Sequence, residues 1–388
     1  MAKVEGTVDP RFAALRDVME KNLGNGLEIG AAVSVVIDGK MVADLWGGHR
    51  DLAKTKAWEK DTLVNVYSAT KGIATMAALR LVDQGKLDLD AKASTYWPEF
   101  AAHGKGDVPV RWLFCHKSGV PAVRQPIGLD DLYDFDRYAG LIAAEEPFWT
   151  PGTRHGYHAL SIGHLLGTLI KRIDGRSIGR YVKEELSDPF GLDFHIGAGP
   201  ELDARIADMQ MPPPPEPGDF DVLGAILANP GSAGFQAFFN PPAIHPDVVN
   251  TRAWRAAELA GGNGHGNARG LARIYGALAT DGRLDGKVVL TPETITKANT
   301  EQTRGPDVVL AEQSTRFGLG FMMTQGDVAH AAFGPNAHAF GHPGAGGSLG
   351  YADPDARIGF GYVMNQMRPG LVTGPRAQEL IDALYACL

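Results

Sequence analysis

Ser68 and Lys71 have the residue types and the spacing for nucleophilic chemistry. They stand three positions apart in the segment NVYSATKGIA, and residues three apart on a helix share a face. A serine hydroxyl is a poor nucleophile until a base removes its proton, and a lysine can be that base when burial or a nearby cation lowers its pKa. Because both residue types are common, this spacing alone more often marks an N-cap serine and a solvated lysine.

Two later segments carry further groups that could act on a substrate. Tyr157 follows the turn PGTRHG and precedes an apolar segment, so its hydroxyl could face a cleft. The glycine-dense run from 341 to 347 leads into a strand, where the backbone can approach a ligand closely and its N–H groups can stabilise an oxyanion. Taken singly, Tyr157 is more simply a core or rim aromatic, and the glycine run a strand connection.

The strands that must position these groups are expected at both ends of the chain. Two β-rich runs flank Asp38-Gly39, a two-residue hairpin signal. Three more runs, FGLGFMM, SLGYADP and RIGFGYVMN, follow near the C-terminus, and the last two are joined by a turn at 353–355.

Helices are expected where apolar residues recur at helical spacing between capping signals. They cover 9–24, about 68–84, 160–173, 268–280 and the segment from about 375 onward. The proline-rich stretch 209–217 can be neither helix nor central strand. It is expected to be an extended loop, either at the border of a site or on the surface.

This order of elements predicts an α+β fold. We expect one antiparallel sheet with flanking helices from residues 1–85 and 285–388, an inserted mainly helical domain at 86–284, and an active site between them.

Composition excludes several functions. The 388 residues include 37 Lys and Arg against 45 Asp and Glu, a net charge of −8 with no basic run. Nucleic acid and anionic membranes are therefore poor partners. The two cysteines, Cys115 and Cys387, are too few for a disulfide scaffold and are expected to be small buried apolar residues. No signal peptide or long apolar run stands out, so a cytoplasmic protein is expected.

Together the three motifs resemble those of the serine β-lactamase and DD-peptidase superfamily. Ser-x-x-Lys is followed about 90 residues later by a tyrosine after Pro-Gly, and then by a glycine-rich strand entry. LFCHKSGV (113–120), the helical segment 161–194 and the segments 270–295 and RFGLGF also resemble family segments, so that the similarity spans about 28–386.

The departures from that pattern point to one branch of the superfamily. Where penicillin-binding members carry Tyr/Ser-x-Asn, this chain has Tyr157-His158-Ala159, and where they carry Lys-Thr-Gly it has His342-Pro343-Gly344. A histidine near its ordinary pKa of ~6.5 is mostly neutral at pH 7. Without the asparagine amide of the second motif and the lysine ammonium of the third, recognition of anionic, amide-bearing substrates is weakened more than recognition of neutral esters. This combination is most similar to the family VIII, β-lactamase-like carboxylesterases.

The resemblance implies a mechanism and a set of site residues. Ser68 would attack an ester carbonyl, with Lys71 and Tyr157 sharing general-base work. The N–H groups of Ser68 and Ala345 would form the oxyanion hole. His342, Gly344 and Ala345 would bind substrate.

The expected reaction is hydrolysis of short-chain carboxylic esters through an acyl-enzyme, with weak cephalosporin hydrolysis and no cofactor. The alternatives are an amide or peptide hydrolase, an acyltransferase, or a non-catalytic β-lactam or peptide sensor. Pocket walls are expected from loops 118–128, 209–222 and 233–246, with FFNPPAIHP (238–246) and Phe148-Trp149 as apolar lining or core. The acyl preference and the oligomeric state stay open.

Two competing sites are weaker. Ser348 lies in a Gly-x-Ser-x-Gly match, the nucleophile elbow of α/β-hydrolases, but that elbow needs a helix after it and a histidine downstream. Strand is expected after Ser348, and no histidine follows His342. The twelve histidines, among them His155, His158 and His265, show no recognised metal-ligand spacing, so no metal is expected.

Overall fold

One large antiparallel sheet assembled from both chain ends organises the molecule. The computed structural model describes residues 3–212, 221–326 and 332–388. Within these residues nine strands form the sheet in the order β1-β3-β2-β14-β13-β12-β11-β10-β9. Its strands are β1 (Val4–Val8), β2 (Gly30–Ile37), β3 (Lys40–Gly48), β9 (Thr303–Pro306), β10 (Ser314–Phe317), β11 (Met322–Met323), β12 (Phe340–Pro343), β13 (Leu349–Asp353) and β14 (Ile358–Met364).

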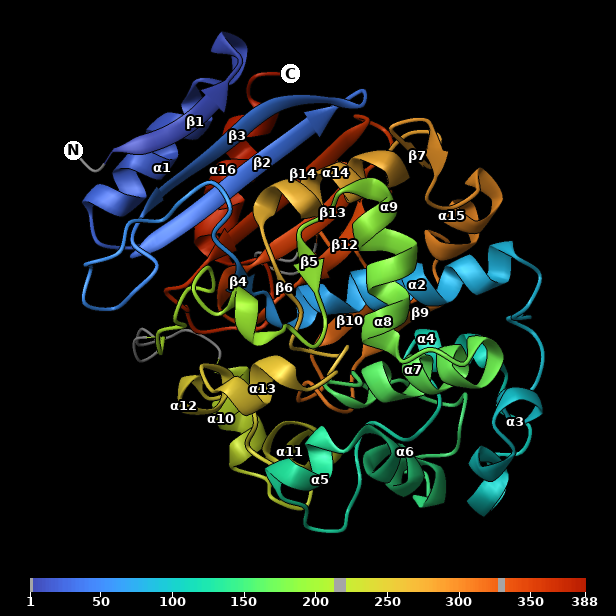
Figure 1. The fold of residues 1–388 in the computed structure, drawn as a ribbon. Helices are drawn as coiled ribbons and strands as arrows, with labels where there is room; N and C mark the ends of the chain where they lie inside the picture. Colours follow the sequence, from blue (N-terminus) through green and yellow to red (C-terminus); the bar gives the residue numbers. More distant parts are fainter. Residues whose placement is uncertain (1–2, 213–220, 327–331) are drawn as a thin grey trace.

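The N-terminal and C-terminal strands join where β2 pairs with β14 (Figure 1). The hairpin β2–β3 forms as expected, because Asp38 and Gly39 both adopt positive φ, at 50° and 76°. That is the backbone of a type I′ turn. β13 and β14 are likewise antiparallel neighbours. The α+β fold with a sheet drawn from both termini is therefore confirmed.

The strand expected over FGLGFMM is wrong in detail. The segment divides into the end of β10 and the short β11, which pair with each other through Phe317 and Met322. Two glycines break the run: Gly320 has a φ of +70°, and a Cβ on Gly318 would lie 2.1 Å from the carbonyl oxygen of Ala298. β12, which carries His342, was not expected as a strand.

Helices cover the sheet and fill the middle of the chain. The longer ones are α1 (Ala14–Gly24), α2 (Thr70–Asp83), α6 (Phe135–Ala144), α7 (Ser161–Asp174), α14 (Ala268–Leu278) and α16 (Gly374–Tyr385). The shorter ones are α3 (Ala93–Tyr96), α4 (Val110–Phe114), α5 (Leu129–Tyr133), α8 (Ile178–Val182), α9 (Asp188–Phe190), α10 (Val222–Leu227), α11 (Ala233–Phe239), α12 (Pro246–Val249), α13 (Arg252–Ala256) and α15 (Pro292–Ala298). Short strands β4 (Val64–Asn65), β5 (Phe194–His195) and β6 (His265–Gly266) form a small sheet, and β7 (Arg283–Leu284) pairs with β8 (Lys287–Val288).

The expected long helices are present with small shifts. The first begins as a 3₁₀ turn, Pro10–Phe12, in which Asp9 caps the N–H of Arg11 before α1 starts. The N-terminal end of the second is also a 3₁₀ turn, Tyr67–Ala69, which leads into α2. α7 ends at Asp174 and is capped by Gly175, whose φ is 90°.

α14 belongs to the sheet layer. It lies within the range 86–284 expected to form the inserted domain, yet it packs on β2, β13 and β14. Glycines in β14 permit this approach, because a Cβ on Gly359 would lie 2.1 Å from the backbone nitrogen of Gly276. The division of the chain into two domains stays a prediction.

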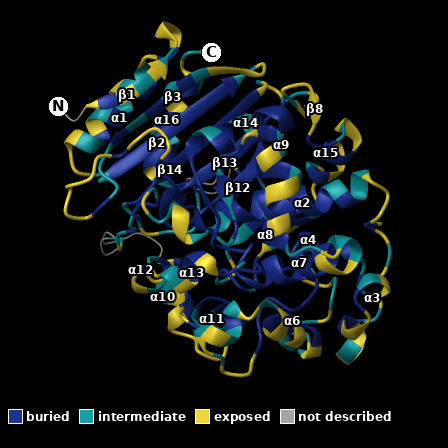
Figure 2. Cartoon of the chain, in the orientation of Figure 1, coloured by how far each residue is buried: buried dark blue, intermediate teal, exposed yellow. Residues whose placement is uncertain are grey.

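The core is continuous around α2, which carries the Ser-x-x-Lys segment. Figure 2 shows the inner strands of the sheet and the central helices as buried, and the edge strand β1 and the outer loops as largely exposed. α2 is buried on almost its whole surface and packs against α7 and α8. Of the cysteines, Cys115 is buried and Cys387 only partly. In the described part of the chain no helix combines the length and the apolar character needed to cross a membrane.

Candidate active site

Ser68 lies in a tight turn at the start of the central helix. It belongs to the 3₁₀ turn Tyr67–Ala69 and is partly exposed, whereas the residues on either side are buried. Tyr67 has a φ of 45°, a strained value for a bulky residue. Its hydroxyl donates to the carbonyl of Ile244 at 3.3 Å, and its carbonyl accepts from Thr70 Oγ1 at 2.5 Å. The turn thereby presents the Ser68 hydroxyl while holding its neighbours inside.

Lys71 is fully buried one turn later and reaches Ser68. Its Nζ lies 3.0 Å from Ser68 Oγ and donates to the carbonyls of Ala159 at 2.7 Å and Gly261 at 2.6 Å. Burial holds the pKa of Lys71 well below its ordinary value. In its neutral form the amine has two N–H donors and one lone pair, so that with the two carbonyls on the donors the lone pair of this form faces Ser68.

Tyr157 closes the group from the inserted part of the chain. Its ring centroid is 4.6 Å from Lys71 Nζ, and its ring stacks on Phe317 and Phe238 at 6.2 and 6.4 Å. Burial raises the pKa of the Tyr157 phenol above its ordinary value, against a smaller lowering by its hydrogen bond with Ser68. The phenol therefore stays protonated at neutral pH.

Histidines around Tyr157 are buried and neutral. The His158 ring lies between the Gly156 carbonyl and the Ser118 hydroxyl, with both contacts at 2.7 Å. Burial lowers the pKa of His158 to about 4 and that of His155 to about 4. Among the described residues no group of three or more histidine, cysteine or acidic side chains could hold a metal ion.

His342 stands beside Tyr157 as an uncharged ring. Its centroid is 5.9 Å from that of Tyr157, and burial lowers its pKa to about 3. Nδ1 lies 2.7 Å from the carbonyl of Pro343, and because that carbonyl can only accept, Nδ1 carries the proton. Nε2 is then a bare acceptor, without a hydrogen-bond partner in the described part of the chain.

The turn after His342 packs directly against the Ser68 turn. A Cβ on Gly344 would lie 2.1 Å from the carbonyl oxygen of Val66, so only glycine fits. The carbonyl of Gly344 accepts from the N–H of Gly347 at 3.0 Å. The C=O of Gly344 and the N–H of Ala345 belong to one trans peptide and point in opposite directions. Because the C=O points toward Gly347, the N–H of Ala345 points away from it.

A mostly apolar pocket opens at Ser68 and Ala345. It encloses about 370 Å³ of empty space, its mouth included, and none of the described residues that line it is charged. The lining residues are Tyr67, Ser68, Ala159, Leu160, Ala237, Phe238, Ile244, Trp254, Gly261, Gly262, Ala345 and Leu371. Of the expected wall loops, 233–246 contributes Ala237, Phe238 and Ile244, the last two from FFNPPAIHP, whereas no described residue of 118–128 or 209–222 lines the pocket. Phe148 and Trp149 instead pack beside the aromatic cluster that includes Tyr157 and Phe317.

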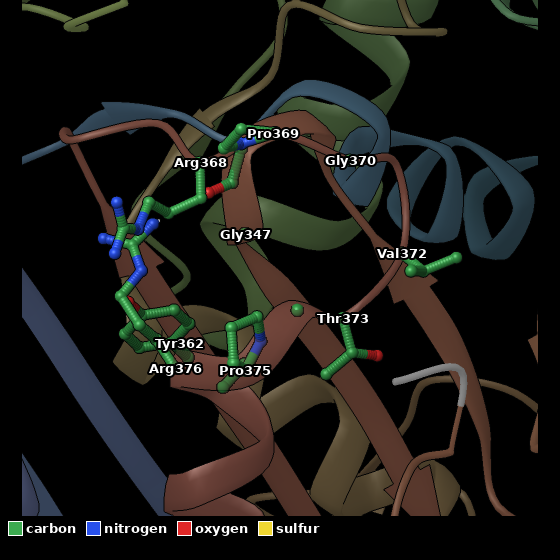
Figure 3. Close-up of a pocket in the computed structure, with 12 residues that line it drawn as sticks. Gly347, Tyr362, Arg368, Pro369, Gly370, Val372, Thr373, Pro375 and Arg376 are labelled. Atoms are coloured by element: carbon green, nitrogen blue, oxygen red, sulfur yellow. The ribbon is translucent and has the colours of Figure 1, made fainter. Parts of the chain in front are cut away.

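A second, smaller cavity lies behind the glycine turn (Figure 3). Arg376 forms part of its wall and donates to the carbonyl of Gly346 at 2.9 Å and to Glu28 Oε2 at 2.6 Å. The Glu28 carboxylate also accepts from the Tyr362 hydroxyl. Through its bond to Gly346, the arginine of this buried ion pair anchors the turn that carries Ala345.

The structure brings Ser68, Lys71, Tyr157, His342 and Ala345 together. Ser348 is fully buried and is followed directly by β13, so the helix that a nucleophile elbow needs is missing. Of the proline-rich stretch 209–217, residues 213–217 lie outside the described residues. Gln210 pairs with Gln366 in an extended bridge.

Sequence reasoning missed the groups that hold the site. The carbonyls of Ala159 and Gly261, the Glu28–Arg376 pair and the buried Asp307 beneath Tyr157 are distant in sequence from what they contact. Only the Pro306-Asp307 dipeptide carried a signal, and it indicates no more than a turn.

Comparison with known proteins gives one consistent family. A family model described as Beta-lactamase matches residues 15–384. The crystal structure of a family VIII carboxylesterase superposes with a TM-score of 0.91 at 39% identity, covering 100% of both chains. A penicillin-binding protein homolog from Caulobacter crescentus gives 0.90 at 36% identity, again over 100% of both chains. Esterase/beta-lactamase LipL from Mycobacterium tuberculosis strain ATCC 25618 / H37Rv is 32% identical over 95% of this chain and 85% of its own.

Proposed function

Because this chain belongs to the β-lactamase family, we propose that it is a serine carboxylesterase that cleaves short-chain esters through an acyl-enzyme on Ser68. The observation that carries the proposal is the Lys71 amine, fully buried and 3.0 Å from Ser68 Oγ at the edge of an uncharged pocket. The family VIII carboxylesterase and LipL, whose names describe esterases, support the class of reaction.

Acylation begins with proton transfer from Ser68 to the Lys71 lone pair. Oγ attacks the ester carbonyl carbon, and the negative charge moves to the carbonyl oxygen, where the N–H groups of Ser68 and Ala345 donate to it. Collapse of this intermediate breaks the bond to the alcohol oxygen. Tyr157 gives its proton to that oxygen and is reprotonated by the Lys71 ammonium. The resting pair is therefore a neutral amine and a neutral phenol.

Deacylation repeats the path with water in place of serine. Lys71 takes a proton from a water molecule as its oxygen attacks the acyl carbon, and Ser68 leaves with a proton returned through Tyr157. Alcohols and amines that reached the acyl-enzyme would be acylated instead, so hydrolysis and acyl transfer differ only in the attacking group.

The walls of the pocket favour a short, uncharged acyl chain. Ala237, Phe238 and Leu371 line it with apolar groups, and none of the described residues that line it is charged. His342 is a neutral acceptor where a cationic donor would hold a carboxylate, so cephalosporins are expected to be weak substrates. We propose a small-molecule ester as the partner, a cytoplasmic location, and no nucleic-acid or membrane partner.

A substrate panel with two serine variants tests the proposal. Wild type is expected to hydrolyse p-nitrophenyl acetate and butyrate faster than longer esters, and faster than a chromogenic cephalosporin or a D-alanyl peptide. Ser68→Ala should lose at least about 1,000-fold in kcat, while Ser348→Ala, which removes the buried hydroxyl of the competing serine, keeps activity. Activity that survives Ser68→Ala but not Ser348→Ala would overturn the assignment, and preference for the peptide would change the substrate class.

A further inference from the structure

Asp307 is a buried carboxylate whose partners include the backbone of Tyr157. Its side chain is fully buried, and Oδ1 accepts from the N–H groups of Tyr157 at 2.9 Å, Val309 at 2.9 Å and Leu310 at 3.0 Å. Oδ2 accepts from Thr315 Oγ1 at 3.2 Å. Such a burial is tolerated only when hydrogen bonds satisfy the charge.

The contact joins two distant parts of the chain. Tyr157 comes from the helical middle, while Asp307 directly follows the sheet strand β9. His155 and Asp307 form an isolated parallel bridge, in which the N–H of Val308 donates to the carbonyl of His155 at 3.1 Å. The backbone just before Tyr157 is thus joined to the segment that follows β9, the strand at one edge of the sheet.

The bond to Tyr157 exceeds what the local turn needs. Val309 and Leu310 donate to the aspartate two and three residues before them, which already makes a complete side-chain-capped turn. The turn does not need the third bond, from the N–H of Tyr157. That bond instead fixes the position of the Tyr157 backbone.

We propose that Asp307 is a positioning residue for Tyr157, whose Oδ1 holds the Tyr157 backbone so that the phenol stays beside Lys71 and Ser68. The inference rests on the proposed function, since it assigns Asp307 to the proton transfer through Tyr157. Thr315 and His155 support the carboxylate in turn, because Thr315 Oγ1 lies 2.8 Å from His155 Nε2.

Asp353 offers a matched control elsewhere in the protein. It is also fully buried, and its Oδ1 caps a turn by accepting from Asp355 at 3.0 Å and Ala356 at 3.2 Å. Its Oδ2 accepts from the hydroxyl of Tyr385, as Asp307 accepts from Thr315. Asp353 differs in having no bond to the candidate site.

The experiment compares alanine variants at both positions and adds an asparagine variant at Asp307. We expect Asp307→Ala to lower kcat for an alkyl ester by about 100-fold with little change in KM, the effect of misplacing a catalytic group. Asp353→Ala should lose stability to a similar degree but keep kcat. Asp307→Asn should recover most of kcat, since its side-chain oxygen still accepts and its amide can donate to Thr315.

Two further measurements keep the inference separable from the proposed function. If Asp307→Ala does not fold, Asp307→Glu and Asp353→Glu are compared in the same way. The added methylene of glutamate moves the carboxylate oxygen away from the N–H groups that it accepts from. Hydrogen exchange at the Tyr157 amide reads the contact without any ester turnover and should accelerate in Asp307→Ala alone. Equal kcat in the two alanine variants, or unchanged Tyr157 exchange, would overturn the inference. A wild-type protein that turns over no ester would overturn the proposed function instead.

Discussion

The Nζ of Lys71 lies 3.0 Å from the Oγ of Ser68, and the same nitrogen donates hydrogen bonds to two backbone carbonyls. The carbonyls of Ala159 and Gly261 lie at 2.7 and 2.6 Å and can only accept. In the neutral state this geometry leaves one tetrahedral position on nitrogen, occupied by the lone pair and facing the serine hydroxyl. The arrangement therefore prepares proton transfer before any substrate arrives.

Replacing Lys71 by arginine should separate the charge of this residue from its basicity. Arginine stays protonated in proteins, so Lys71→Arg places a permanent cation near Ser68 but has no lone pair to accept the proton of the Ser68 hydroxyl. We expect Lys71→Arg and Lys71→Ala each to lower kcat for p-nitrophenyl butyrate by about 100-fold or more. Steady-state kinetics on the folded variants measures the effect. Substantial activity in Lys71→Arg would show that the residue acts through its charge alone.

Tyr157→Phe should affect poor leaving groups more than good ones. The phenol protonates the departing alcohol, and p-nitrophenolate needs that proton far less than an alkoxide does. We expect kcat for an alkyl butyrate to fall by about 100-fold or more, with a smaller loss for p-nitrophenyl butyrate. Comparing the two esters on one enzyme preparation cancels errors in active-site concentration. Equal losses on both substrates would contradict the assigned proton transfer.

Burial of Lys71 should also appear in the pH dependence of stability. Its pKa lies well below 10.5 in the folded protein and near ~10.4 in the unfolded chain. Between those values the unfolded state binds the extra proton, so the free energy of unfolding rises with pH, by up to about 1.4 kcal/mol per pH unit. Lys71→Met lacks this contribution.

Denaturant unfolding of wild type and Lys71→Met between pH 7 and pH 10 tests whether the free energy of unfolding rises with pH. The stability of wild type relative to the variant should increase as pH rises through the window. A relative stability that stays flat or falls would mean that Lys71 is charged in the folded protein. The same neutral amine predicts that kcat/KM decreases on acidification, as the folded enzyme takes up a proton at Lys71.

The Glu28–Arg376 pair should contribute strongly to stability and to the glycine turn. Arg376→Met leaves the buried Glu28 carboxylate without its cation, although burial already raises the pKa of Glu28 to about 7. We expect a loss of about 3–5 kcal/mol in the free energy of unfolding, together with a lower kcat because Gly346 loses a donor.

A double-mutant cycle separates the two effects. Glu28→Gln/Arg376→Met removes both charges and should regain part of the stability lost in Arg376→Met, but not the kcat. Recovery of kcat together with stability would show that the turn does not depend on the arginine.

Local patterns were enough to predict the Ser-x-x-Lys turn, the β2–β3 hairpin and the helices around them. Ser68 and Lys71 needed only helical spacing to come within reach, and Asp38-Gly39 needed only the backbone freedom of its residues. The motif order then indicated the family, because it depends on residue types and spacing that the chain displays directly.

The contacts that complete the site come from the packing of distant segments. Tyr157 and Asp307 are separated by 150 residues, and Glu28 and Arg376 by 348. FGLGFMM has the alternation of a strand, but the close approach of Ala298 to Gly318 breaks it in two.

Residue type and short spacing therefore settle which groups could react. The pKa of Lys71, the tautomer of His342 and the support beneath Tyr157 depend on burial and on partners brought by the fold. These properties depend on residues that are distant in sequence and become neighbours only in the folded protein, so no single stretch of sequence determines them.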